Sequence, residues 1–116
     1  MNSDRFKDVE CDVVIRAAHD AMDIVNGKWK IPILAVLTFN KKRYSEILKE
    51  VKGISGKMLS KELKDLELNQ ILKRNVLDTQ PITVEYELTA HGQKFKAVIE
   101  QLAIWGIEFR KHVTSK

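Results

Sequence analysis

A row of polar and cationic side chains after Gly53 is the part of the sequence best suited to chemistry. Four of these side chains recur at the spacing of one helix face, and a leucine stripe recurs on the opposite face. The polar row comprises Lys57, Ser60, Lys61 and Lys64, and the stripe comprises Leu59, Leu63 and Leu66. Ammonium groups neutralise phosphates and short polar side chains reach base edges, so the row is suited to binding duplex DNA. The plainer alternative is a solvated helix face, which is what most lysine rows are.

Further candidates for DNA contact lie on both sides of this row. Ser55 and Gly56 stand where the helix should begin, and free N–H groups at a helix start can meet a phosphate oxygen. The whole predicted set of DNA contacts is Arg43, Ser45, Ser55, Gly56, Lys57, Ser60, Lys61, Lys64, Lys73, Arg74, Thr79, Gln80 and Thr83. We expect Lys57, Ser60 and Lys61 to lie nearest the bases. Arg74 has a structural alternative, an ion pair with Glu85 or Glu87 across a hairpin.

Helical periodicity supplies the elements that position these residues. It predicts a helix over about 9–25 that stops at Asn26-Gly27, and a buried second helix that starts near Lys28 or Trp29. Pro32 supports that start, because proline is tolerated only in the first turn of a helix. A polar connection over 40–44 then leads to Ser45, the predicted N-cap of a short helix that ends near residue 51. Two short helices joined by a turn at Gly53 indicate a helix-turn-helix.

After the second of these helices the period changes to that of strands. Apolar and polar residues alternate over 82–88, and the apolar run 71–77 is the predicted partner strand across a turn at 78–81. Thr89 is the predicted cap of a last helix that reaches about residue 112. The predicted fold is therefore mainly α with a small β-hairpin.

The two terminal helices carry more apolar surface than one small core could cover, which indicates a partner subunit. The predicted dimer interface comprises Val14, Ala17, Ala18, Ala21, Leu102, Trp105, Phe109 and Val113. For Trp105 and Phe109 the alternatives are a place in the core or in the wall of an effector pocket. We favour the dimer interface, because aromatic residues are enriched at interface centres.

Composition limits the remaining possibilities. The 116 residues suffice for one domain, predicted to span 1–116, and 20 Lys and Arg against 16 Asp and Glu give a net charge of +4. No run approaches the ~20 apolar residues of a membrane span, so we expect a cytoplasmic protein without a membrane partner. No phosphate-binding loop, zinc-protease motif or catalytic triad motif occurs, so we expect neither an enzyme nor a cofactor. Four scattered donors could converge if the terminal helices pair, but without a dense motif we expect no metal site: Cys11, His19, Glu108 and His112.

The order of elements is that of a winged helix-turn-helix, and several short segments resemble the HxlR-type transcriptional regulators. Asn26-Gly27-Lys28-Trp29 resembles their Gly-Gly-Lys-Trp element, and Arg43-Tyr44-Ser45-Glu46-Ile47 is similar to their Arg-Phe-Ser-Glu-Leu. Gly53-Ile54-Ser55-Gly56-Lys57-Met58-Leu59 resembles their recognition helix, and Val84-Glu85-Tyr86-Glu87-Leu88-Thr89 resembles their wing. Trp105-Gly106 resembles a frequent feature of their last helix. The resemblance implies a homodimer, related in fold to the MarR group, that binds double-stranded DNA at an inverted repeat. A winged helix used for protein or RNA contacts is the alternative.

Two departures from the family pattern concern function. Thr83 stands where the wing usually has an arginine, which removes one phosphate or minor-groove contact. Many members carry a cysteine about thirteen residues before the tryptophan; here that position is Arg16, and Cys11 lies five residues upstream. Cys11 is therefore the candidate sensor for a redox or electrophile signal, and an inert or interface cysteine is the alternative, since its acidic neighbours disfavour a thiolate. No effector is assigned.

Overall fold

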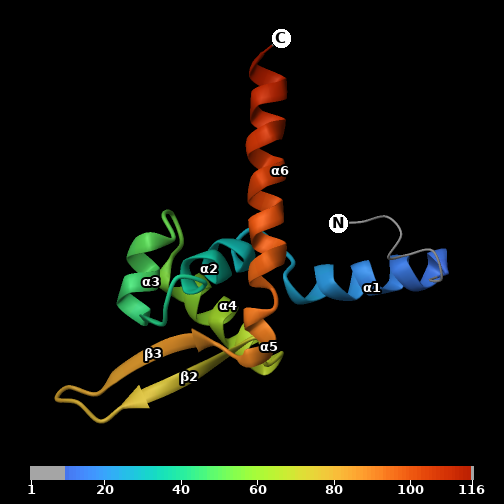
Figure 1. The fold of residues 1–116 in the computed structure, drawn as a ribbon. Coiled ribbons are helices and arrows are strands. Elements are labelled where there is room, and N and C mark those ends of the chain that lie inside the picture. Colours follow the sequence, from blue (N-terminus) through green and yellow to red (C-terminus); the bar gives the residue numbers. More distant parts are fainter. Residues whose placement is uncertain (1–9, 116) are drawn as a thin grey trace.

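The computed structural model describes residues 10–115, which form six helices and a small three-stranded sheet, with two of the helices extending away from the rest (Figure 1). The elements are α1 (Cys11–Ile24), α2 (Lys30–Leu37), β1 (Lys42–Arg43), α3 (Tyr44–Glu50), α4 (Gly56–Leu68), β2 (Leu72–Leu77), β3 (Thr83–Leu88), α5 (Ala90–Gln93) and α6 (Lys96–Thr114). Helices α3 and α4 with the turn between them form the helix-turn-helix, and β2 and β3 form the wing. The predicted order of elements is confirmed.

The core lies where α2, α3 and α4 meet the base of the sheet. Its fully buried side chains are Ile33, Leu34, Leu37, Ile47, Leu59, Leu63, Leu66 and Leu72. The leucine stripe of α4 thus faces inward, as its spacing predicts, and the polar row faces outward. Burial of one leucine side chain contributes roughly 1.5–3 kcal/mol of hydrophobic stabilisation. The three leucines of the stripe therefore determine which face of α4 is exposed to solvent.

The two helices of the helix-turn-helix are capped in different ways. Ser55 caps α4 at the predicted start of that helix, since its Oγ accepts a hydrogen bond from the Met58 N–H at 3.1 Å. For α3 the prediction is wrong: the N-cap is Arg43, whose backbone N–H donates to Glu46 Oε1 at 2.8 Å, and Ser45 lies within the first turn. The reason is that the chain enters α3 directly from a strand, so its last extended residue is Arg43 and the Glu46 side chain reaches back to it.

The sheet has three antiparallel strands in the order β1-β3-β2, so it is larger than the predicted hairpin. The segment predicted as a polar connection contains β1, in which Lys42 lies opposite Tyr86 and Arg43 opposite Glu85. An ion pair of 3.4 Å between Lys41 and Glu85 supports this pairing. Pairing with β1 also covers one edge of β3, which a lone hairpin would leave open.

The last predicted helix is interrupted. Thr89 caps its start as predicted, accepting from the Gly92 N–H at 2.9 Å, but the chain forms the short α5 before α6 begins at Lys96. Gly92 packs so closely on Ile71, the residue before β2, that a side chain at position 92 would collide with the carbonyl oxygen of Ile71. Phe95, at the junction, packs against the core. This docking places the base of α6 on the core and directs the rest of it outward.

Helices α1 and α6 extend away from the rest of the molecule, to the right and to the top of Figure 1. Neither helix contains a buried residue, and together they carry ten of the fifteen large hydrophobic residues that are exposed in the described chain. The Cα radius of gyration is 16.7 Å, against about 13 Å for a compact domain of 100 residues. A single copy of the chain therefore leaves two long apolar helices uncovered.

Candidate nucleic-acid interface

The outward face of α4 presents lysines in two different electrostatic situations. Lys57 and Lys64 are exposed and have no carboxylate within ion-pair distance among the described residues. Lys61 is exposed too, but its Nζ lies 3.8 Å from Glu62 Oε1 and 3.9 Å from Asp65 Oδ2. The uncompensated positive charge of this helix therefore lies on Lys57 and Lys64.

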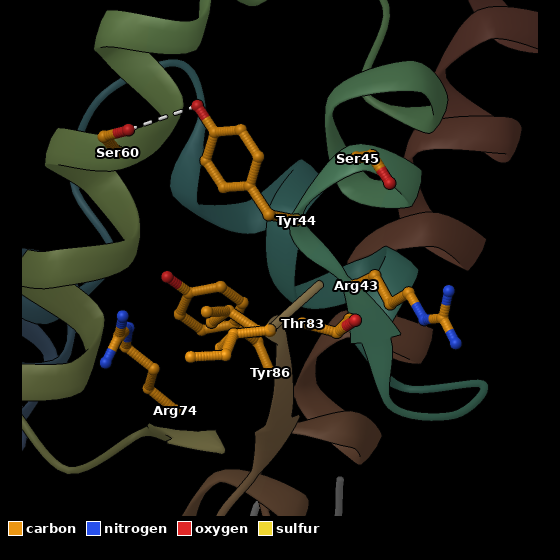
Figure 2. A pocket seen from close by; sticks show the side chains of 9 residues that line it. Arg43, Tyr44, Ser45, Ser60, Arg74, Thr83 and Tyr86 are labelled. Atoms are coloured by element: carbon orange, nitrogen blue, oxygen red, sulfur yellow. Dashed lines mark hydrogen bonds between the residues drawn. The ribbon is translucent and has the colours of Figure 1, made fainter. Parts of the chain in front are cut away.

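A cleft of about 580 Å³ lies between α3, α4 and the wing (Figure 2). Its lining consists of Arg43, Tyr44, Ser45, Ser60, Arg74, Ile82, Thr83, Val84 and Tyr86. The lining has two arginines and five hydroxyl groups and includes no carboxylate. Within the described part of the chain, neither Arg43 nor Arg74 forms an ion pair. Such a lining suits a polyanionic backbone, because every polar group in it is either a cation or a neutral hydrogen-bonding group.

The cleft unites five of the predicted DNA contacts, which come from three separate parts of the chain. These are Arg43, Ser45, Ser60, Arg74 and Thr83. Four other lining residues were not predicted from the sequence: Tyr44, Ile82, Val84 and Tyr86. Tyr86 belongs to the alternation over 82–88 and Tyr44 to the predicted polar connection. Their hydroxyl groups were the signal that could have indicated a polar surface.

Ion pairs along the wing differ from those predicted. The alternative pairing of Arg74 with Glu85 or Glu87 is wrong, because Arg74 lies opposite Tyr86 in the register and Lys73 pairs with Glu87 at 3.3 Å. The Asn75 amide donates to Glu87 Oε1 at 2.9 Å. This hydrogen bond, with the neighbouring Lys73 ammonium, holds the pKa of Glu87 below its ordinary value of 4.5. Arg74 is thus free to face the cleft, while Lys73 is already compensated.

The turn of the wing carries no cation. Residues 75–83 include one carboxylate, Asp78, and no lysine or arginine. Thr79 Oγ1 donates to the Pro81 carbonyl oxygen at 2.6 Å and lies 2.8 Å from Thr83 Oγ1, which orders this turn. Thr79 and Gln80 are exposed in the turn that joins β2 to β3, at the end of the hairpin farthest from the core (Figure 1).

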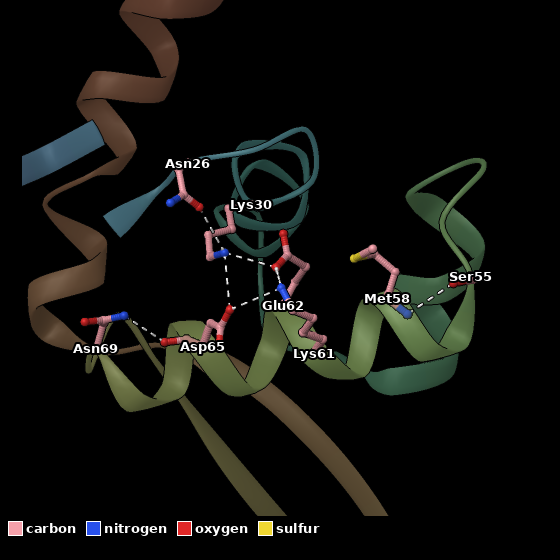
Figure 3. Close-up of polar contacts among 8 residues, drawn as sticks. All are labelled: Asn26, Lys30, Ser55, Met58, Lys61, Glu62, Asp65 and Asn69. Carbon is pink, nitrogen blue, oxygen red and sulfur yellow. Dashed lines mark hydrogen bonds and ion pairs between the residues drawn. The ribbon is translucent and has the colours of Figure 1, made fainter. Parts of the chain in front are cut away.

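A buried ion pair fixes α4 relative to α2 (Figure 3). Lys30 Nζ lies 3.0 Å from Glu62 Oε1, and the two side chains are each 6% exposed. The same ammonium lies 3.5 Å from Asp65 Oδ2 and 3.4 Å from Asn26 Oδ1, so residues of α4 and of the α1–α2 connection converge on it. Every polar atom that is buried in the described side chains has a hydrogen-bond partner. The pair therefore holds the polar face of α4 at a set angle to the body.

Comparison with known proteins agrees with this arrangement. The model of the HxlR-like helix-turn-helix family matches residues 24–114. This chain belongs to that family. The HTH-type transcriptional regulator YodB of Bacillus subtilis is 37% identical over 89 residues, which are 77% of this chain and 80% of the relative. YtcD, from the same organism and also named an HTH-type transcriptional regulator, is 38% identical over 85 residues, 73% of this chain and 68% of the relative.

Solved structures of transcriptional regulators have the same fold. The redox regulator HypR in its reduced form superposes with a TM-score of 0.80 at 30% identity, over 86% of this chain and 99% of that chain. The reduced form of YodB superposes with a TM-score of 0.70 at 36% identity, over 78% of this chain and 89% of that chain. The predicted family, the winged helix-turn-helix fold and the role as a transcriptional regulator rather than an enzyme are confirmed.

The remaining predictions for this HxlR-family chain concern Cys11, membrane spans and metal binding. Cys11 is exposed and is the first residue of α1. Between residues 10 and 115, none of the helices combines the length and the apolar composition that crossing a membrane needs. Over the same residues, no three His, Cys, Asp or Glu side chains gather closely enough to hold a metal ion.

Proposed function

We propose that this HxlR-family regulator binds an inverted-repeat operator as a twofold homodimer, with α4 in the major groove and the wing beside it. The observation that carries the proposal is the surface formed by the outward face of α4 and the adjoining cleft. Among residues 10–115, its cations Lys57, Lys64, Arg43 and Arg74 have no carboxylate partner, and the inner face of α4 is fixed by buried leucines. Phosphates fix the register of such a surface on the duplex, and base edges give the specificity.

The exposed apolar faces of α1 and α6 support the homodimer. The proposed interface contains Val14, Ala17, Ala18, Ala21, Leu102, Trp105, Phe109 and Val113, of which Val14 is half-buried and the others are exposed in the single chain. A second copy of the same chain covers both faces at once, because a twofold interface is self-complementary. Two α4 helices related by that axis require half-sites about one helical turn apart. On this proposal, residues 1–116 form one DNA-binding domain with terminal dimerisation helices.

Cys11 is the proposed site of any thiol-dependent signal, by analogy with the redox regulator HypR. The position of Cys11 favours the alternative, a cysteine in the dimer interface. One face of α1 carries Cys11, Ile15, Ala18 and Met22 at helical spacing. A signal at this face changes the angle between the two subunits and so the spacing of the recognition helices.

Because its target is DNA, we place the protein in the cytoplasm of a bacterial or archaeal cell.

The experiment that tests the proposal titrates the protein with random duplex DNA and with tRNA at two salt concentrations, followed by selection from a random duplex pool. We expect duplex binding that weakens steeply with salt, and an enriched sequence with two symmetric half-sites. Equal binding to tRNA with no enriched sequence would instead support the alternative, a winged helix that contacts RNA. Enrichment of a single half-site without symmetry would contradict the homodimer.

A further inference from the structure

We propose that Tyr44 is a positioning residue that fixes the Ser60 hydroxyl as a hydrogen-bond acceptor, and that Ser60 thereby selects adenine or cytosine at one position of each half-site. The inference rests on the proposed function, since it requires α4 to enter the major groove. It assigns a base preference to one residue of the polar row.

The hydrogen bonds of Tyr44 determine where each proton lies. Tyr44 Oη is 2.9 Å from the Gly56 carbonyl oxygen. It is also 3.1 Å from Ser60 Oγ, the hydrogen bond drawn in Figure 2. A carbonyl oxygen only accepts, so the single phenolic proton of Tyr44 is donated to Gly56. The bond between the two hydroxyls must then run the other way, with Ser60 donating its proton to Tyr44 Oη.

This arrangement leaves the exposed Ser60 oxygen with lone pairs and no free proton. The Ser60 side chain makes no other hydrogen bond within the described residues. Phosphate oxygens only accept, and so do the O6 and N7 atoms of guanine and the O4 atom of thymine in the major groove. The groups that Ser60 can bind directly are the amino groups of adenine and cytosine, because these donate.

Local packing holds Tyr44 in this position. Its ring is half-buried and packs against the core, so the hydroxyl cannot move far. Gly56 makes room for it, because a Cβ atom at that position would lie 3.3 Å from Tyr44 Oη.

The test is selection from a random duplex pool with the full-length wild-type chain and with the Tyr44→Phe, Ser60→Ala and Tyr44→Phe/Ser60→Ala variants. For the wild type we expect one position per half-site at which adenine or cytosine on the contacted strand exceeds guanine or thymine about threefold to tenfold, the effect of one hydrogen bond. Tyr44→Phe and Ser60→Ala should both flatten this same position and leave the others unchanged. The double variant should match Ser60→Ala, because Tyr44 acts only through Ser60.

Ser115→Ala is the matched control. Like Ser60→Ala it removes a serine hydroxyl, but Ser115 lies at the C-terminal end of α6, outside the cleft, and its hydroxyl donates to the His112 carbonyl oxygen at 3.0 Å, so its removal should leave the base preference intact. Thermal unfolding will show whether Tyr44→Phe destabilises the chain. If it does, Ser60→Ala still tests the role of Ser60 as a hydrogen-bond acceptor, because Ser60 is exposed. An unchanged profile in both single variants, or a uniform loss of affinity on all sequences, would overturn the assignment. A wild-type chain that enriches no sequence would overturn the proposed function itself, and with it this inference.

Discussion

The individual cations of the interface are unequal, because some of them already have carboxylate partners. We predict that Lys57→Ala and Lys64→Ala each weaken duplex binding at low salt and reduce the slope of log K against log salt by about 0.9, the value for one lost phosphate contact. Lys61→Ala should change this slope less, since its ammonium lies within 4 Å of Glu62 and Asp65. Fluorescence anisotropy at several salt concentrations measures the slopes. Equal slopes for all three variants would show that the two carboxylates do not compensate Lys61.

Glu87 provides a pH-dependent test of the wing. Its pKa is lower in the folded chain than in the unfolded one, because the Asn75 amide and the Lys73 ammonium favour the charged form. Its contribution to stability is therefore complete above the unfolded pKa near 4.5 and is lost as the pH falls through the folded pKa. We expect Glu87→Gln to lower the melting temperature at neutral pH, and the difference from wild type to shrink below about pH 4. A difference that is constant from pH 3 to 7 would contradict this explanation.

Between elements, the buried ion pair of Lys30 and Glu62 connects α2 to the recognition helix. Lys30→Met leaves the Glu62 carboxylate 4% exposed, with the exposed Lys61 ammonium 3.8 Å away as a weaker partner, so the variant should lower the free energy of unfolding by about 3 kcal/mol. The double variant Lys30→Met/Glu62→Leu should recover most of this loss, because no buried charge remains; Asp65 keeps Lys61 as its partner. Denaturant unfolding of the three chains measures the coupling. A double variant as unstable as the single one would show that the pair is needed for its geometry and not only for its neutrality.

The elements also show how far the sequence determines the fold. The periodicity of 59, 63 and 66 gave the correct buried face of α4, and the alternation over 82–88 gave β3, because both patterns extend over several residues. Strand β1 could not be predicted, since two residues carry no period and the pairing depends on the open edge of β3. The break between α5 and α6 depends on the contact of Gly92 with the backbone of Ile71, which is distant in sequence. In the site, the charged residues could be predicted from their types, whereas the roles of Tyr44 and Tyr86 depend on neighbours that only the fold supplies.

For the whole molecule, the extended shape leaves the apolar faces of α1 and α6 uncovered in a single copy, which supports the proposed homodimer. Trp105 is 65% exposed and stacks on Phe109 with ring centroids 5.2 Å apart, so the pair forms a flat aromatic surface outside the core. Buried aromatic anchors contribute about 2 kcal/mol or more to an interface, so we predict that Trp105→Ala raises the dimer dissociation constant about thirtyfold. Because Trp105 is outside the monomer's core, the helical content of the dissociated subunit should be largely retained in circular dichroism.

Phe39 offers the matched control for this prediction. It is 85% exposed, lies between α2 and β1, and belongs to neither terminal helix. Phe39→Ala removes a large exposed aromatic side chain just as Trp105→Ala does, but it should leave the dissociation constant unchanged in sedimentation equilibrium. If Trp105→Ala dissociates the dimer, operator binding should fall at protein concentrations below the new dissociation constant and recover above it, since each α4 is itself intact. Loss of DNA binding that high protein concentration does not restore would mean that Trp105 supports the DNA-binding surface directly, which its position on α6 gives no reason to expect.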